Sequence, residues 1–455
     1  MAMALVENLR PYGQNPQALE QLYQEAQRGG QVSEFTKAVQ TLHTEAPDQL
    51  LFQAWFYRLT SGAEEVTSKS SPNWRVAIGL SALCGFVFWL LSDMDTFTLG
   101  NHFPLLFFAA APICAFFIMA FLFVTQQPRT KSSLYYLLLL GLLLAGGIAY
   151  ITYLGLKISA PANQDSYLSL AILHLALLAW VAIGTWLLWP KRAAAGDHFA
   201  FLIKSFETVV VGGLFVLAGG AFTAISFGLF ETLGIAVEEG LMRLFIAGGG
   251  GLIPVLAVAL TYDAKRTPQE QNFSEGISRL ITTLMRLMLP LVLLMLVVYV
   301  GLIPFNFRQP FENRDVLIVY NLLLFAVIGV LVSATPIASH HLHPTQERWL
   351  RRGLLLLAGL AVLISLYALT AIGYRTWNDG FTPNRVTIIG WNLLNIGLLT
   401  LLLIRQYRSP AQDWLQAMYA TFAQGAKAYL VWTLLVLLLI PWIFRWVSEP
   451  INLWR

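Results

Sequence analysis

The sequence predicts an all-α, polytopic membrane protein of about eleven transmembrane helices, preceded by a small helical region. Hydrophobic residues make up 57% of the 455 residues and charged residues only 12%, whereas soluble domains carry about 25% charge. The mean hydropathy is +0.62. Apolar stretches of about 20 residues, the length that crosses a bilayer as a helix, fill most of the chain. They are apolar on all sides, which indicates helices and not the alternating strands of a barrel.

Residues 1–70 form a separate domain that we expect to be a soluble, amphipathic helical region. Ser33 and Asp48 are suitable caps for the second and third of its helices, and Gly29 and Gly30 should end the first. The region is interpreted as a cytoplasmic cap or, alternatively, as a module that binds a protein partner. Residues 62–72 should link it to the transmembrane bundle of residues 71–455. The apolar faces of the three expected helices lie within residues 19–26, 35–42 and 51–59.

The basic residues between the spans predict the orientation. Sixteen Lys and Arg residues fall on one side of the predicted membrane and eight on the other, which favours a cytoplasmic N-terminus. With eleven spans the C-terminus is then periplasmic, and a count of ten or twelve would reverse it. No cleavable leader is visible, so the first span should act as a signal anchor. The predicted spans are residues 76–92, 103–125, 134–156, 167–189, 208–235, 241–262, 280–304, 316–338, 353–374, 386–404 and 428–444.

Three ionisable residues lie within or near these spans. Lys204 and Glu207 are three positions apart on one helical face, where they can neutralise each other. Arg286 lies at a comparable depth on the same side. We hypothesise that Glu207 and Arg286 meet inside the bundle, as a structural clamp or as a gate below a polar cavity; snorkelling of Arg286 to the interface is the alternative.

The sixth predicted span contains four consecutive glycines, Gly248, Gly249, Gly250 and Gly251, followed by Pro254. Four glycines cost about 3 to 4 kcal/mol of helix propensity relative to alanine, and broken helices of this kind hold substrates in secondary transporters. The segment is therefore a candidate substrate site, together with Lys204, Glu207 and Arg286. The competing interpretation is close helix packing, with the glycines of residues 212–220 on the fifth span as the expected partner.

The loop between the ninth and tenth spans has a readable local structure. Gly380 permits a turn, Thr382 can cap a helix, and Pro383 suits its first position. The helix dipole and neighbouring basic side chains would attract an anion, although interface anchoring explains the same residues. The candidate outer-rim anion site consists of Arg375, Thr382, Asn384 and Arg385.

This loop also carries a family resemblance. The run YRTWNDGFTPNR at residues 374–385, with residues 288–300 and 204–230, resembles an uncharacterised bacterial family of multi-pass inner-membrane proteins, the domain of unknown function of 4153 type. The resemblance covers residues 204–404. It implies a bacterial inner-membrane location and supplies no substrate, cofactor or catalytic residue.

Other site signals are weak. Cys84 and Cys114 lie within spans and are interpreted as packing residues, and His174 as an interior histidine with satisfied nitrogens. His340, His341 and His343 lie close together, but a solvated loop is the preferred interpretation over a metal site. We therefore predict no metal and no cofactor.

Enzyme signatures are missing: no zinc-protease motif, nucleophile elbow, phosphate-binding loop or dinucleotide fingerprint is present. The charge of +4 follows the orientation rule and does not indicate nucleic-acid binding. The leading hypothesis is a permease or channel for an unknown solute, with an anion as one candidate class. The alternatives are a membrane scaffold that docks a partner on its N-terminal helices and a membrane transferase that uses Asp379, Arg375 and Arg385. The bilayer is the one certain partner, and the oligomeric state is not predicted.

Overall fold

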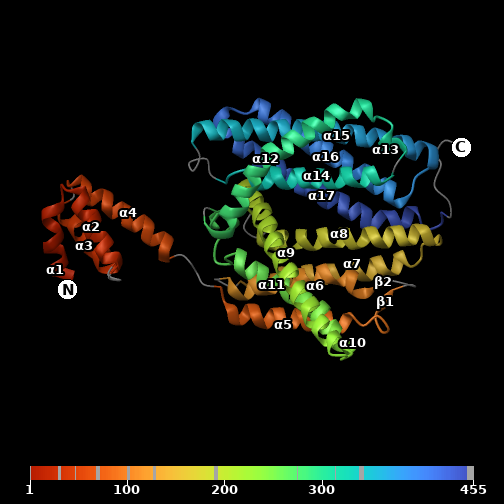
Figure 1. The fold of residues 1–455 in the computed structure, drawn as a ribbon, viewed down its shortest axis with the longest axis horizontal. Helices are drawn as coiled ribbons and strands as arrows, with labels where there is room; N and C mark the ends of the chain where they lie inside the picture. Colours follow the sequence, from red (N-terminus) through yellow and green to blue (C-terminus); the bar gives the residue numbers. More distant parts are fainter. Residues whose placement is uncertain are drawn as a thin grey trace. The chain divides into compact units, whose positions relative to one another are not determined.

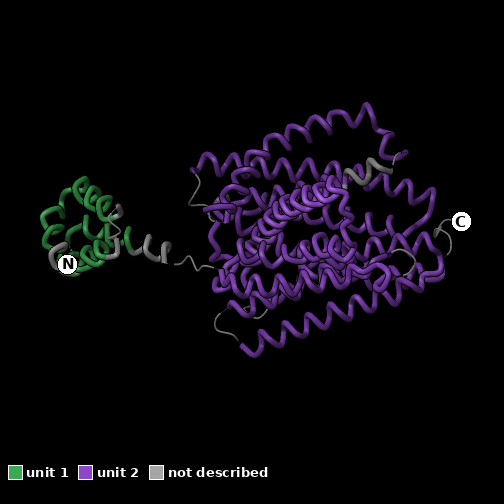
Figure 2. The backbone as a smooth tube through the Cα atoms, turned by 60° about the horizontal axis from the view of Figure 1, so that its bottom comes forward, with its two compact units in different colours: residues 1–71 green, residues 72–455 purple. Residues whose placement is uncertain are grey.

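The computed structural model divides the chain into two compact units, residues 1–71 and residues 72–455 (Figure 2). The structure describes residues 2–28, 32–46, 48–67, 72–99, 103–126, 130–188, 193–273, 275–312, 314–337 and 343–447.

The first unit contains four α-helices around its own apolar core. The sequence did not predict the first of them. The third helix begins at Val32, one residue before the expected cap position Ser33. The fourth begins two residues after Asp48 and continues into the expected linker. The Gly29–Gly30 pair lies outside the described residues. The helices are α1 (Ala2–Leu9), α2 (Pro16–Arg28), α3 (Val32–Glu45) and α4 (Leu50–Thr67), with a 3₁₀ turn η1 (Arg10–Tyr12); the core includes Leu9, Leu19, Phe35, Val39, Leu42, Phe52 and Trp55.

The second unit is a bundle of long helices with short connections. One two-residue antiparallel pair, β1 (Thr98–Leu99) and β2 (Phe103–Pro104), precedes the second long helix. The helices are α5 (Trp74–Leu91), α6 (Leu105–Thr125), α7 (Lys131–Gly155), α8 (Pro161–Leu188), α9 (Ala195–Thr232), α10 (Glu239–Arg243), the π-helical turn η3 (Leu244–Gly248), α11 (Gly249–Thr261), α12 (Gly276–Leu302), α13 (Gln309–Glu312), α14 (Arg314–Ala334), α15 (Pro344–Asp379), α16 (Pro383–Arg408) and α17 (Trp414–Ile443), with 3₁₀ turns η4 (Pro268–Glu270), η5 (Ile303–Phe305) and η7 (Ala411–Asp413).

The prediction of an all-α, polytopic membrane protein is confirmed. Within the described residues, ten helices are long and apolar enough to cross a membrane. The eighth predicted span coincides with α14, in which residues Leu322–Ala334 form a shorter apolar segment. Several helices start earlier than predicted: α9 begins at Ala195, α15 at Pro344 and α17 at Trp414. The first turns of α9 and α15 are polar, so hydropathy alone does not detect them. The first part of α17 begins with the buried Trp414 and Leu415 and then mixes polar with apolar residues.

Helix α9 differs from its neighbours in direction and exposure. It runs obliquely across the bundle in Figure 1, whereas α8 and α14 to α17 run roughly alongside one another. With 38 residues and a rise of about 1.5 Å per residue, it is about 57 Å long, nearly twice the thickness of a hydrocarbon core. In its first part, Phe199 and Ile203 are buried in the main hydrophobic core. Almost none of the residues of its apolar stretch is buried.

Contacts between helix ends sort those ends into two groups. At one end of the bundle, Asn384 Nδ2 donates to Ser166 Oγ at 3.4 Å and Asn163 Nδ2 to the Val447 carbonyl at 3.1 Å. At the other end, Trp186 Nε1 donates to the Ser133 carbonyl at 3.0 Å. The ends that these contacts join are ones that an alternating path through the membrane places on the same side. Which group faces the cytoplasm stays a prediction.

Candidate functional site

The glycine-rich segment forms a continuous helical path and not a break. The π-helical turn η3 ends at Gly248, and α11 continues through Pro254. A Cβ added at Gly251 would lie 2.8 Å from Gly85 Cα on α5, and one at Gly85 would lie 2.6 Å from the Gly248 carbonyl oxygen. Gly249 and Gly250 have nothing within 4 Å of an added Cβ. Two of the four glycines therefore permit close approach of two backbones.

The packing partner differs from the expected one. We predicted that the glycines of the fifth span, α9, would face this segment. Helix α9 does pack against α11, but of these glycines only Gly212 comes near it: an added Cβ there would lie 3.7 Å from Ile253 Cγ2, while one at Gly213, Gly219 or Gly220 would meet nothing within 4 Å. The glycine that packs closely against Gly248 and Gly251 is Gly85 on the first span, α5, which lies directly against α11 and η3. A single glycine in a span, such as Gly85, gives no sequence signal of its own.

Lys204 and Glu207 form an ion pair, with Lys204 Nζ 2.9 Å from Glu207 Oε2. Both side chains are 4% exposed, and within the described residues they are the only charged ones that are buried. Nζ also donates to the Asn272 carbonyl and to Ser278 Oγ, each at 2.9 Å, so all three ammonium donors are used. Ser278 Oγ donates in turn to Glu207 Oε2 at 2.7 Å. The Phe273 ring lies 4.8 Å from Nζ.

The hypothesised contact between Glu207 and Arg286 is wrong. Glu207 accepts from Lys204 and Ser278, while Arg286 Nε donates to the Ala334 carbonyl at 3.1 Å. Arg286 thus ties α12 to the end of α14, and the ion pair ties α9 to the loop before α12 and to α12 itself. The predicted spacing of Lys204 and Glu207 on one helical face is confirmed.

The outer-rim loop has the local structure that the sequence predicted. Gly380 has φ +78°, and Thr382 caps α16 by accepting from the Arg385 N–H at 3.3 Å. Arg385 is not free for an anion, because it pairs with Asp379 Oδ2 at 2.7 Å and donates to the Gly380 carbonyl. Asn384 Nδ2 donates a hydrogen bond to Ser166 Oγ. Arg375 is half-buried, and its Nη1 is buried without a hydrogen-bond partner.

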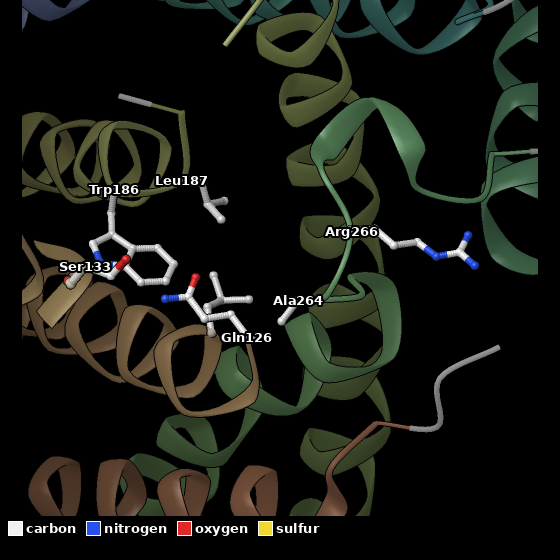
Figure 3. A pocket seen from close by; sticks show the side chains of 7 residues that line it. Gln126, Ser133, Trp186, Leu187, Ala264 and Arg266 are labelled. Carbon is white, nitrogen blue, oxygen red and sulfur yellow. Dashed lines mark hydrogen bonds between the residues drawn. The ribbon is translucent and has the colours of Figure 1, made fainter. Parts of the chain in front are cut away.

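A small cavity lies at the opposite end of the bundle, where α6, α7 and α8 meet the loop after α11 (Figure 3). Its volume of about 30 Å³ suits about one water molecule. Figure 3 shows the Gln126 side chain among the lining groups, whereas the Arg266 guanidinium points away from them. The cavity is lined by Leu122, Gln126, Ser133, Trp186, Leu187, Ala264 and Arg266.

A polar cluster at mid-length of three helices was not predicted. His174 on α8 and Trp391 on α16 are in contact: the Trp391 indole N–H donates to His174 Nε2 at 3.2 Å. His174 Nδ1 lies 2.8 Å from the Leu170 carbonyl oxygen, which can only accept, so Nδ1 carries the proton. Both nitrogens of a neutral imidazole are therefore satisfied, as expected for His174. The side chain is fully buried.

Helix α17 completes this cluster. The Tyr429 hydroxyl donates to Asn395 Oδ1, and the Tyr429 ring lies 5.2 Å from that of Trp391. Asn395 is fully buried, and its Nδ2 has no hydrogen-bond partner among the described residues; the same holds for the indole nitrogen of Trp432. The Trp432 ring occupies the space beside Gly390, where an added Cβ would lie 1.8 Å from Cζ2.

We call His174, Trp391, Asn395, Tyr429 and Trp432 the midspan cluster. His174 is the fourteenth of 28 residues of α8, Asn395 the thirteenth of 26 of α16, and Tyr429 the sixteenth of 30 of α17. The signal for it was the amides Asn392 and Asn395 within one span. Amides are uncharged, so a rule based on ionisable residues does not mark them, although their burial in hydrocarbon also requires hydrogen-bond partners.

The remaining candidates supply no chemical centre. Cys84 and Cys114 are free, and their thiols are within hydrogen-bonding reach of one another. His340 and His341 lie outside the described residues, and His343 caps α15. Within the part of the chain that the structure describes, no group of three or more His, Cys, Asp or Glu side chains could hold a metal.

The chain matches no protein-family model, no curated protein and no solved structure.

Proposed function

We propose that this integral membrane protein is a permease for a small polar solute and that the midspan cluster binds that solute. The observation that carries the proposal is the position of Asn395. Its amide is fully buried at mid-length of α16, with Nδ2 unpartnered beside Tyr429 and Trp391. Unpaired donors at membrane depth are costly, and polar groups at the bilayer midplane line the binding sites of secondary transporters.

The donor inventory favours an acceptor-rich solute. His174 has no free nitrogen, whereas Asn395 Nδ2 and Trp432 Nε1 each present N–H groups. Carboxylate, phosphoryl or carbonyl oxygens suit such donors, and the Trp391 and Tyr429 rings offer flat apolar surfaces. The proposal therefore keeps the anionic solute class of the sequence hypothesis and moves the site away from Gly248–Gly251.

The Lys204–Glu207 pair has a positioning role in this proposal. Its three hydrogen-bonded donors fix the buried end of α9 against the loop before α12. We also propose the bacterial inner membrane as the location, with the N-terminus cytoplasmic, on the family resemblance and on the distribution of basic residues.

The test is solute flux in proteoliposomes. Wild-type protein, Asn395→Leu and the surface control Asn378→Leu are reconstituted and compared for entry of small carboxylates, phosphate esters and neutral polyols. At least one solute should enter faster with wild type than in empty liposomes. Asn395→Leu should reduce that flux at least tenfold, and Asn378→Leu should leave it unchanged. Equal flux through wild type and Asn395→Leu for every transported solute would contradict the proposal.

A further inference from the structure

Two cations without a carboxylate partner lie on neighbouring segments, where the end of α7 lies against the end of α17, and Lys157 Nζ also donates to the Tyr153 hydroxyl. Lys157 follows α7, and Arg445 follows α17. The Ser159 N–H donates to the Arg445 carbonyl at 3.1 Å, and the Asn163 side chain donates to the Val447 carbonyl at 3.1 Å. These backbone contacts fix the two segments side by side. The position of the two cations is thus set by the fold and not by flexible side chains alone.

Aromatic rings support both cations on the exposed surface. Lys157 Nζ lies 4.0 Å from the centre of the Tyr153 ring, and the Arg445 guanidinium lies 4.8 Å from that of Trp446. Tyr153 is 61% exposed and Trp446 is 77% exposed. Exposed tyrosine and tryptophan at a helix end are typical of the membrane–water interface. The cations therefore sit at headgroup level.

Neither cation has a carboxylate partner among the described residues. Arg385, at the same end of the bundle, is in contrast paired with Asp379. Arg445 Nε is buried and unpartnered, so the donors left for a ligand are those of its two Nη groups. A guanidinium stacked on a ring keeps its edge donors available in a planar fork, which matches two oxygens of a phosphate. An ammonium beside it adds a second positive charge.

We propose that Lys157 and Arg445 bind the phosphate of an anionic phospholipid headgroup. The acyl chains of that lipid would lie along the exposed apolar residues of the adjoining helices, such as Leu439 and Trp442 on α17, which are 48% and 54% exposed. This site is independent of the midspan cluster.

The test uses full-length protein in neutral detergent, with lipid binding measured by native mass spectrometry and the thermal unfolding midpoint as a second readout. Phosphatidylglycerol, phosphatidylcholine with the same chains, and inorganic phosphate are compared. Each basic residue near an anionic surface contributes about fivefold in affinity. Lys157→Gln and Arg445→Gln should each weaken phosphatidylglycerol binding about fivefold, and the double variant about thirtyfold.

Arg308→Gln is the matched control, because it removes an exposed positive charge from the loop before α13 and should leave binding unchanged. Lys157 is exposed, so its substitution tests the site without disturbing the fold. Equal binding of phosphatidylglycerol and phosphatidylcholine, or equal binding by the double variant and Arg308→Gln, would overturn the proposal. If inorganic phosphate alone shifts the unfolding midpoint as much as phosphatidylglycerol does, the site binds a free anion and the lipid proposal is also overturned.

Discussion

The three N–H groups of the Lys204 ammonium each donate one hydrogen bond. Its partners are a carboxylate, a backbone carbonyl and a hydroxyl, each at 2.9 Å. This arrangement offsets the desolvation of two charges that are 4% exposed. The pair depends on both members, because a buried charge without its partner is far more costly than no charge.

Removal of one member of the pair should therefore be more harmful than removal of both. Lys204→Met is expected to destabilise the bundle by about 3 to 5 kcal/mol, because it leaves Glu207 buried without its counter-ion. The double variant Lys204→Met/Glu207→Leu should recover most of that loss. Chemical unfolding in detergent measures both. Similar losses in the single and double variants would show that the pair is not coupled.

The sequence predicted local chemistry at single residues better than partners. The cap at Thr382, the turn at Gly380 and the spacing of Lys204 and Glu207 depend on near neighbours in the chain, and all three are found. The partner of Arg286 and the contact of Asn395 with Tyr429 join helices far apart in sequence. No periodicity or motif encodes such pairs.

Among the helices, α11 shows how four adjacent glycines divide into two roles. Gly248 and Gly251 face α5 closely, while Gly249 and Gly250 face open space. The close face allows backbone contact, which stabilises helix pairs in membranes. The open face has no such role and carries only the poor helix propensity of glycine.

Alanine at these positions should have opposite effects. Gly251→Ala places a Cβ 2.8 Å from Gly85 Cα and should cost about 1 to 3 kcal/mol, as overpacking does. Gly250→Ala meets nothing within 4 Å and should stabilise the helix by about 0.5 to 1 kcal/mol. Thermal unfolding of the two variants, side by side, measures the difference. Equal destabilisation by both would contradict the assigned faces.

The chain contains two cysteines, and both lie where α5 packs on α6. Because their thiols are within reach of one another, mild oxidation with copper phenanthroline should join them in an intramolecular disulfide. Loss of labelling by a polymer-linked maleimide after denaturation detects the bond. Cys114→Ser should keep one reactive thiol under the same treatment. Full labelling of both thiols in oxidised wild type would show that α5 and α6 pack in another register.

Hydropathy located the long helices because each must be apolar over about 20 residues. It could not locate their true starts, since α9 and α15 begin with polar turns and the first part of α17 mixes polar with apolar residues, although all three are helical. It also could not show that α9 crosses the bundle obliquely (Figure 1). That course depends on packing against α11 and α17, which involves residues distant in the chain.

For the whole molecule, the division into two units predicts that residues 1–71 fold without the membrane region. They have their own core and an ion pair between Arg58 and Glu20 at 2.8 Å. Expressed alone, this unit should show a helical spectrum and one cooperative thermal transition. Absence of a cooperative transition would mean that its core depends on the rest of the chain.

Acid should weaken this unit through Glu20. The hydrogen bond from Arg58 lowers the pKa of the Glu20 carboxyl in the folded unit. Stability from this group is therefore present above the ordinary glutamate pKa of about 4.3 and is lost as the pH falls through the lowered value. In Arg58→Gln the decrease of thermal stability on acidification should be smaller than in wild type. In the exposed control Lys37→Gln that decrease should be the same as in wild type.

A permease site at the midspan cluster requires that solute and water reach it from outside the bundle. This requirement is tested most directly by cysteine labelling at Asn395 in a Cys84→Ser/Cys114→Ser background, with a small hydrophilic methanethiosulfonate reagent. Leu393→Cys, 54% exposed on the apolar face of the same helix, is the matched negative position, and Tyr407→Cys, 93% exposed, is the positive one. We expect labelling at Asn395→Cys and Tyr407→Cys but not at Leu393→Cys. Labelling at Tyr407→Cys alone would show that the cluster is polar packing between helices and would contradict the permease assignment.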